Sequence, residues 1–95
     1  MSNLTKIIGK NIRKIRYERS MTQLDLASLS DCACGYISEV ENGLSKISLE
    51  KFISLSINMG MNPSKLLYLI MTDEENSENN SENDSYDNSN NIYDN

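Results

Sequence analysis

The chain has 95 residues, a hydrophobic fraction of 38% and a formal net charge of -5, with one proline and two cysteines. This length accommodates one compact domain with some chain to spare, and the low apolar content indicates that part of the chain lies outside a core. The N-terminal residues lack the apolar stretch of a signal peptide, and the longest apolar run, Leu66 to Met71, is too short to cross a bilayer. We therefore expect a cytoplasmic protein without a membrane anchor.

The net charge conceals two parts of opposite sign. All nine Lys and Arg residues precede position 66, and with the six acids up to Thr72 they give residues 1–72 a net charge of +3. From Asp73 onward there are eight acids and no base, in a segment rich in Asn and Ser. Such a composition buries too little apolar surface to offset the entropy of ordering the chain. We therefore predict a folded domain over 1–72 and a disordered tail over 73–95.

Two helices are predicted in the first 30 residues. Apolar residues recur at helical spacing from Leu4 to Ile15, and basic residues occupy the other faces of that helix. Thr22 is a suitable N-cap for a second helix, because Asp25 stands three residues later, where it completes a capping box. The second helix is expected to extend to about Leu29.

Three further helices follow, so the predicted fold class is all-α. The segment 33–42 forms a short helix that ends at a Gly C-cap signal. Ser48 caps a fourth helix that is closed by Gly60, and Asn62 caps a fifth with Pro63 at its first position. The side chains expected to face the core in these three helices are Ile37 and Val40, then Leu49, Phe52, Leu55, Ser56 and Met59, then Leu66, Leu67 and Ile70.

Four segments carry a resemblance to a known family, with their spacing intact. They are Thr22 to Ala27, Tyr36 to Gly43, Ser48 to Phe52 and Asn62 to Leu67. Over roughly residues 8–67 the chain closely resembles the Cro and phage-repressor family, also called the Xre family. The resemblance implies a five-helix DNA-binding domain in which the second and third helices form a helix-turn-helix. It also implies that the 33–42 helix enters the major groove of double-stranded DNA.

The same resemblance implies contacts with the sugar-phosphate backbone of DNA. At the start of the second helix, exposed N–H groups and the helix dipole suit a phosphate, and the Gln23 amide would clamp it together with the backbone of Thr22 and Gln23. The loop after the third helix follows the sugar-phosphate backbone, and the bases of the first helix lie nearer the rim. The implied phosphate contacts are therefore Thr22, Gln23, Asn42, Ser45 and Lys46, with Arg13 at the rim.

Base contacts are expected from the N-terminal half of the 33–42 helix. The residues implied are Cys34, Gly35, Ser38 and Glu39, with Tyr36 beside them. None of these is the Arg or Gln that grips guanine or adenine with two hydrogen bonds, although Glu39 can accept from a cytosine amino group. Gly35 either lets the backbone approach the groove or is a neutral surface substitution. We expect such a protein to depend strongly on phosphate contacts and DNA shape.

Structural roles are expected for three further residues, and no disulfide or metal site is expected from the two cysteines. Arg16 and Glu41 match a family pair that forms a partly buried ion pair between the first and third helices, and Ala27 is small because the third helix crosses there. Cys32 and Cys34 are too close in sequence to close a useful disulfide loop, and without His or another Cys pair they do not make a zinc site. We expect neither a metal nor a cofactor.

Oligomerisation and the tail each leave alternatives open. The family usually binds as a two-fold homodimer on half-sites ~34 Å apart. Tyr68, Leu69 and Met71 are more apolar than a monomer needs and form the expected dimer surface, unless they close over the first helix. The acidic tail is a solubilising appendage, an intramolecular competitor that covers the basic face, or a docking segment for a protein partner.

The leading hypothesis is a sequence-specific transcriptional regulator, most simply a repressor. The resemblance does not separate a phage repressor from the controller protein of a restriction-modification system or from an antitoxin. A hypothesis of another class is a protein-binding antagonist that uses the acidic tail. Enzymatic activity is not expected, because the sequence has no His, no Gly-rich phosphate loop and no nucleophile with a base at a recognisable spacing.

Overall fold

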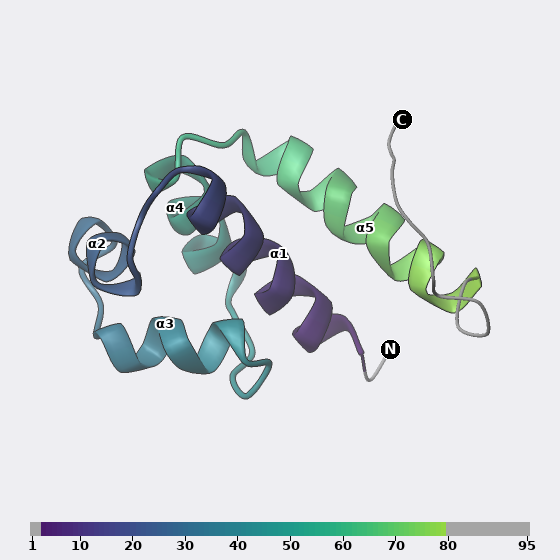
Figure 1. The fold of residues 1–95 in the computed structure, drawn as a ribbon, viewed down its shortest axis with the longest axis horizontal. Helices are drawn as coiled ribbons and strands as arrows, with labels where there is room; N and C mark the ends of the chain where they lie inside the picture. Colours follow the sequence, from purple (N-terminus) through teal and green to yellow (C-terminus); the bar gives the residue numbers. More distant parts are fainter. Residues whose placement is uncertain (1–2, 80–95) are drawn as a thin grey trace.

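The computed structural model describes residues 3–79, with side chains as far as residue 73, and most of the predicted tail lies outside this range. Its elements are α1 (Leu4–Glu18), α2 (Gln23–Leu29), α3 (Cys34–Glu41), α4 (Leu49–Asn58) and α5 (Pro63–Asn79) (Figure 1). This part of the chain contains no strand, so the predicted all-α, five-helix fold is confirmed. None of the described helices has the length and apolar character that a bilayer crossing requires.

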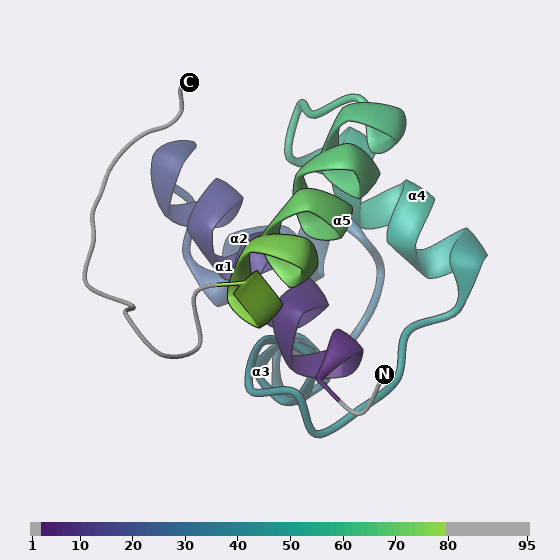
Figure 2. The same cartoon turned by 90° about the vertical axis from the view of Figure 1, so that its right-hand side faces the viewer.

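One core joins all five helices. The side chains that are almost completely buried include Ile12, Leu26, Ile37, Leu55 and Leu66, one from each helix. In both views α3 and α5 lie on opposite sides of α1, so α1 forms the centre of the domain (Figures 1 and 2). The arrangement leaves the outer side of α3 exposed, because α1 and α2 cover only its inner side.

The predicted core stripes are correct except at two leucines. Leu49 is 72% exposed and Leu67 is 49% exposed. Leu49 is the first residue of α4 and lies beside the buried stripe of Phe52, Leu55 and Ser56. Leu67 lies beside the buried residues Leu66 and Ile70 of α5. Leu69 packs partly against the core instead. Both exposed leucines thus become surface residues that need a separate explanation.

The helices begin and end with well-defined capping motifs. Thr22 and Asp25 form the predicted capping box, and the Ser48 hydroxyl accepts from the backbone N–H of Lys51 at 3.0 Å. Helices α1 to α4 all end in the same two-bond turn, in which one residue takes a left-handed conformation. That residue is Ser20 (φ 57°), Asp31 (φ 54°), Gly43 (φ 73°) and Gly60 (φ 75°) in turn. These tight reversals keep the connections short and fix α3 close to α2.

Gly9 is the point at which α1 and α3 approach most closely. A Cβ atom at Gly9 would lie 2.1 Å from the carbonyl oxygen of Val40 and 2.9 Å from that of Glu41. Only hydrogen atoms on the α carbon therefore allow the two backbones to touch. The role of Gly9 was not predicted, because a lone Gly within a helical stripe has no sequence pattern of its own.

We predict opposite effects of alanine at two glycines. Gly9→Ala should lower the free energy of unfolding by about 1–3 kcal/mol or more, because the added methyl meets rigid backbone. Gly35→Ala is the matched control, because nothing lies within 4 Å of a Cβ at Gly35. It should raise stability by up to ~1 kcal/mol through helix propensity. Urea unfolding of both variants measures this, and equal stabilities would contradict the close contact at Gly9.

Candidate nucleic-acid interface

The outer face of α3 is the exposed part of the helix-turn-helix. Ile37 and Val40 point into the core, so the opposite side of the helix faces solvent. Cys34, Gly35 and Glu39 are exposed there, and Ser38 is half-buried. These are four of the five residues predicted to contact bases, and the structure brings them together on one surface.

Tyr36, the fifth predicted base contact, is placed differently. It is half-buried and packs against the core, and burial, with a smaller effect of Cys32, raises the pKa of its hydroxyl. Its ring therefore supports α3 from one side, and only part of it is available to a ligand.

Two hydrogen bonds connect α3 to the loop that follows it. The Ser45 hydroxyl donates to Oε1 of Glu39 at 2.9 Å, and Nδ2 of Asn42 donates to the Ser38 hydroxyl oxygen at 3.4 Å. Each bond joins a residue predicted to contact a base with one predicted to contact a phosphate. The helix and the loop thus present a single polar surface, in which Ser45 orients the Glu39 carboxylate.

The start of α2 offers fewer free donors than the sequence suggests. The backbone N–H of Thr22 donates to Oδ2 of Asp25 at 2.9 Å, so this donor of the predicted phosphate clamp already has an acceptor. The hydrogen bonds from the Thr22 backbone and side chain lower the pKa of Asp25, which therefore stays charged. The N–H groups of Gln23 and Leu24 have no acceptor within residues 3–79. They are the donors that remain for an anion.

Arg16 and Glu41 form the ion pair that the sequence predicts. Nε of Arg16 lies 2.6 Å from Oε2 of Glu41, and Nη2 lies 2.9 Å from Oε1. Both side chains are buried, at 5% and 1% exposure, and the hydrogen bond to Glu41 is the main cause that raises the pKa of Arg16. The guanidinium also donates to the carbonyl oxygen of Met21 at 2.8 Å. The pair therefore ties the end of α1 to α3 and to the connection that leads into α2.

Gln23 extends this pair to the start of α2. Its Nε2 donates to Oε1 of Glu41 at 3.1 Å, a contact that the sequence analysis did not foresee. One hydrogen of the amide is used in this bond and the other remains for a ligand. The group that was expected to hold a phosphate is thereby oriented by the same carboxylate that holds Arg16.

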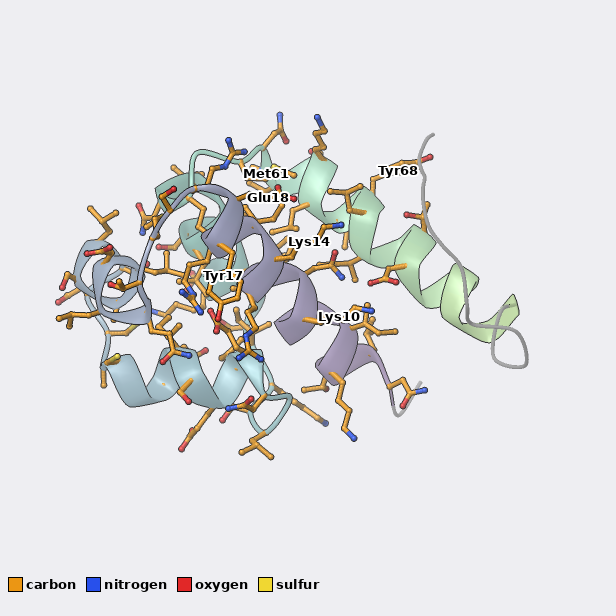
Figure 3. The ribbon with its side chains drawn as sticks, in the orientation of Figure 1. Lys10, Lys14, Tyr17, Glu18, Met61 and Tyr68 are labelled. Atoms are coloured by element: carbon orange, nitrogen blue, oxygen red, sulfur yellow. The ribbon has the colours of Figure 1, made fainter. Side chains whose placement is uncertain are left out.

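A row of basic side chains lies along the solvent side of α1. We call Lys6, Lys10, Arg13 and Lys14 the α1 basic strip. All four are exposed, and Lys10 lies four residues from Lys6 and from Lys14 and three from Arg13. Tyr17 continues the row, and its ring centroid lies 5.8 Å from the guanidinium carbon of Arg13 and 4.7 Å from that of Arg16 (Figure 3). These two cations lower the pKa of the Tyr17 hydroxyl, with Arg13 the larger cause. The contacts of Tyr17 with these two cations were not predicted, because no sequence pattern marks an exposed aromatic residue on a helix.

The two cysteines remain free thiols, Cys32 half-buried and Cys34 exposed. Among the side chains that the structure describes, no three His, Cys, Asp or Glu residues gather as a metal site would require. The site therefore consists of polar side chains, backbone donors and cations.

A short helix, a tight turn and a second helix with an exposed outer face define a helix-turn-helix, the class of fold that reads double-stranded DNA. A family model described as Helix-turn-helix matches residues 12–66. The chain therefore belongs to the Cro/C1-type helix-turn-helix family, whose members are DNA-binding transcriptional regulators and not enzymes.

Relatives support the same assignment. The chain is 34% identical over 67 residues to Control protein C.BamHI of Bacillus amyloliquefaciens, which covers 70% of this chain and 83% of that protein. The clp gene regulator ClgR from Corynebacterium glutamicum has the same fold, with a TM-score of 0.78, 24% identity, and coverage of 82% and 83%. The restriction-modification controller protein C.Esp1396I, solved as a tetramer with its natural 35 base-pair operator, has a TM-score of 0.68, 25% identity, and coverage of 73% and 91%.

The buried ion pair gives a test of how α3 is held. Glu41→Ala should lower the free energy of unfolding by about 3–5 kcal/mol, because it leaves Arg16 buried without its counter-charge. The double variant Arg16→Met with Glu41→Leu should be less destabilised than Glu41→Ala, because neither charge remains. Urea unfolding measures both. Glu18→Ala, an exposed acid on α1, is the control and should change stability by less than about 0.5 kcal/mol. A Glu41→Ala variant as stable as this control would show that the pair does not hold α3.

Proposed function

We propose that this chain is a controller-type transcriptional regulator that binds a palindromic operator with α3 in the major groove. The observation that carries the proposal is the rigid mounting of an exposed polar helix, through the buried carboxylate of Glu41 and its bonds to Arg16 and Gln23. The operator complex of C.Esp1396I and the name of the C.BamHI relative support the controller class over an antitoxin. A repressor role is the simplest outcome for a small protein that occupies an operator and excludes polymerase.

Phosphate contacts come from two places on either side of α3. At one end, the N–H groups of Gln23 and Leu24 and the free hydrogen of the Gln23 amide face a strand. At the other end, Asn42, Ser45 and Lys46 follow the backbone. These contacts set the register of the helix in the groove and carry no sequence information themselves.

Sequence is read by the few polar groups of α3. Glu39 accepts from a cytosine amino group with the carboxylate that Ser45 orients, while Ser38 bonds to either type of edge group and Cys34 contacts a thymine methyl. Gly35 leaves open space beside these side chains. Direct base contacts are thus few, so DNA shape contributes a large share of specificity.

Two substitutions separate base reading from backbone binding. Glu39→Ala should relax the preference at one operator position by about 1–3 kcal/mol, because the group that accepts from the cytosine amino group is lost. Lys46→Ala should weaken binding to all duplexes alike and reduce the slope of log affinity against log salt by about 1. Selection of bound duplexes from a random pool, followed by titrations at two salt concentrations, measures both effects. No duplex binding at low salt would refute the regulator and favour the protein-binding antagonist.

The surface for a homodimer differs from the one that the sequence suggests. Tyr68 and Met71 are 66% and 53% exposed, but Leu69 is half-buried against the core and contributes little to an outer surface. Leu67 takes its place on α5. The fifth helix thus still supplies an apolar surface, with a changed membership.

Helix α4 adds a second apolar stripe. Leu49, Ile53 and Ile57 are exposed at four-residue spacing, so they lie on one side of the helix. Nδ2 of Asn58 donates to the carbonyl oxygen of Leu29 and to the Ser30 hydroxyl, so the Asn58 side of α4 faces α2, and the stripe lies on a different side of the helix. The α4–α5 apolar face, as we name it, comprises Leu49, Ile53, Ile57, Leu67, Tyr68 and Met71. We propose that two copies pair through this face and place their α3 helices on half-sites ~34 Å apart.

A charge on this face should separate the subunits. Ile57→Glu is expected to shift the protein to a monomer at micromolar concentration and to weaken operator binding, because burying the carboxylate in the interface is costly. Its melting temperature at a concentration where wild type is also monomeric should stay close to wild type, since Ile57 is 60% exposed. Leu29→Glu, at a residue 61% exposed on α2, is the matched control. Sedimentation that finds wild type monomeric would contradict the dimer.

A further inference from the structure

The acidic segment of this chain begins beside the α1 basic strip. Oδ2 of Asp73 lies 3.4 Å from Nζ of Lys10 and accepts a hydrogen bond of 2.9 Å from Nδ2 of Asn11. Asn11 is itself buried and also donates to the carbonyl oxygen of Ile7 at 2.8 Å, so it holds Asp73 in place. Asp73 was predicted to lie in the tail, but it belongs to the packed part of α5, which continues to Asn79. The acidic segment therefore follows directly on a residue that contacts α1.

Three cations of the strip have no acidic partner within residues 3–73. The ion pairs among the described side chains are Lys10 with Asp73 and Arg16 with Glu41. Lys6, Arg13 and Lys14 remain exposed on the same side of α1 as Lys10. Figure 3 shows Lys10 and Lys14 following one another along this side of the helix. Among the side chains up to residue 73, the strip is thus a row of positive charge in which Lys10 alone has an acidic partner.

The segment after Asp73 has the opposite charge and sufficient length. Its 22 residues contain seven acids and no base. The acids are Glu74, Glu75, Glu78, Glu82, Asp84, Asp87 and Asp94. Residues 74–79 complete α5. The 16 residues that follow would span up to about 50 Å if fully extended, and the longest extent of the structure is 39 Å. Attachment to the end of α5 gives them an effective concentration in the millimolar range relative to the strip.

The α1 basic strip also borders the two proposed sets of phosphate contacts, at the start of α2 and in the loop after α3. Lys6 lies against Gly43 at the start of the loop that contains Ser45 and Lys46, since a Cβ at Gly43 would lie 2.6 Å from Cγ of Lys6. At the other end, Tyr17 stacks on Arg16, whose partner Glu41 holds Gln23. An anion on the strip would therefore occupy the edge of the surface that approaches the DNA backbone.

We propose that residues 74–95 bind the α1 basic strip in cis and compete with DNA phosphate for it. The carboxylates and the phosphates seek the same cations, so the segment weakens binding to any duplex and leaves operator DNA, with its additional base contacts, favoured over bulk DNA. The α4–α5 apolar face is an unsuitable site for this segment, which has few apolar residues. The competition rests on the proposed DNA binding, whereas the cis contact does not.

The cis contact is tested without DNA. Backbone amide NMR spectra of the full chain at about 50 mM salt are compared with a variant in which the seven acids become Asn or Gln, and with a variant in which residues 74–95 are shuffled. We expect the amides of Lys6 to Tyr17 to shift in the neutral variant alone, and to converge at about 0.5 M salt, where the Debye length falls to a few ångströms. Differences confined to residues adjoining Asp73 would overturn the contact and leave the tail to a separate partner molecule.

The competition is tested by affinity for a non-specific duplex. The neutral variant should bind at least about 10-fold more tightly than wild type at low salt, with a ratio that falls toward one as salt rises. The shuffled variant keeps its charges and should match wild type. Equal affinities of neutral and wild-type chains would overturn the competition. NMR shifts in a protein that binds no duplex would support the cis contact and refute the proposed function, so the two failures are distinguishable.

Discussion

The carboxylate of Glu41 lies where α1, α2 and α3 meet, and the orientation of the DNA-facing helix depends on it. It accepts hydrogen bonds of 2.6 and 2.9 Å from Arg16 and one of 3.1 Å from Gln23, so both of its oxygens are satisfied although the group is almost fully buried. Placing two charges in a core costs desolvation energy that an apolar pair would avoid. The charged pair adds geometric specificity, because the two parallel hydrogen bonds between guanidinium and carboxylate constrain the orientation of α3 relative to α1 more tightly than contacts between methyl groups do.

Backbone geometry complements this bond at the other boundaries of α3. The Gly9 contact brings the α1 backbone directly against the last turn of α3. The left-handed residue Asp31 ends α2 before the turn, and the left-handed residue Gly43 ends α3 before the loop. Together these features determine both where α3 begins and how far it lies from the centre of the domain. The side chains on its outer face take no part in this framework, apart from the Ser45 and Asn42 bonds.

Much of the fold could be predicted because it depends on local patterns. Thr22, Asp25, Ser48, Gly43 and Gly60 determine helix ends through bonds within a few residues, and the apolar stripes identify the buried faces. The misplaced residues depend on which neighbour covers which flank of a helix, as at Leu67, Leu69 and Asp73, and a single-helix pattern does not contain that information. The Gln23 contact with Glu41 and the close approach at Gly9 were missed for the same reason, since both arise between helices. The direct contacts predicted for DNA stay predictions.

The open space around Gly35 has a consequence for how this scaffold diversifies. No atom outside the helix lies within 4 Å of a Cβ added there, and α3 has no side-chain cap at Ala33 whose loss would unravel it. New side chains at the groove-facing end of α3 would therefore meet solvent or nucleic acid before they met the rest of the protein. Such a helix end can accumulate substitutions at little thermodynamic cost, so related chains can acquire new operators while their cores remain unchanged.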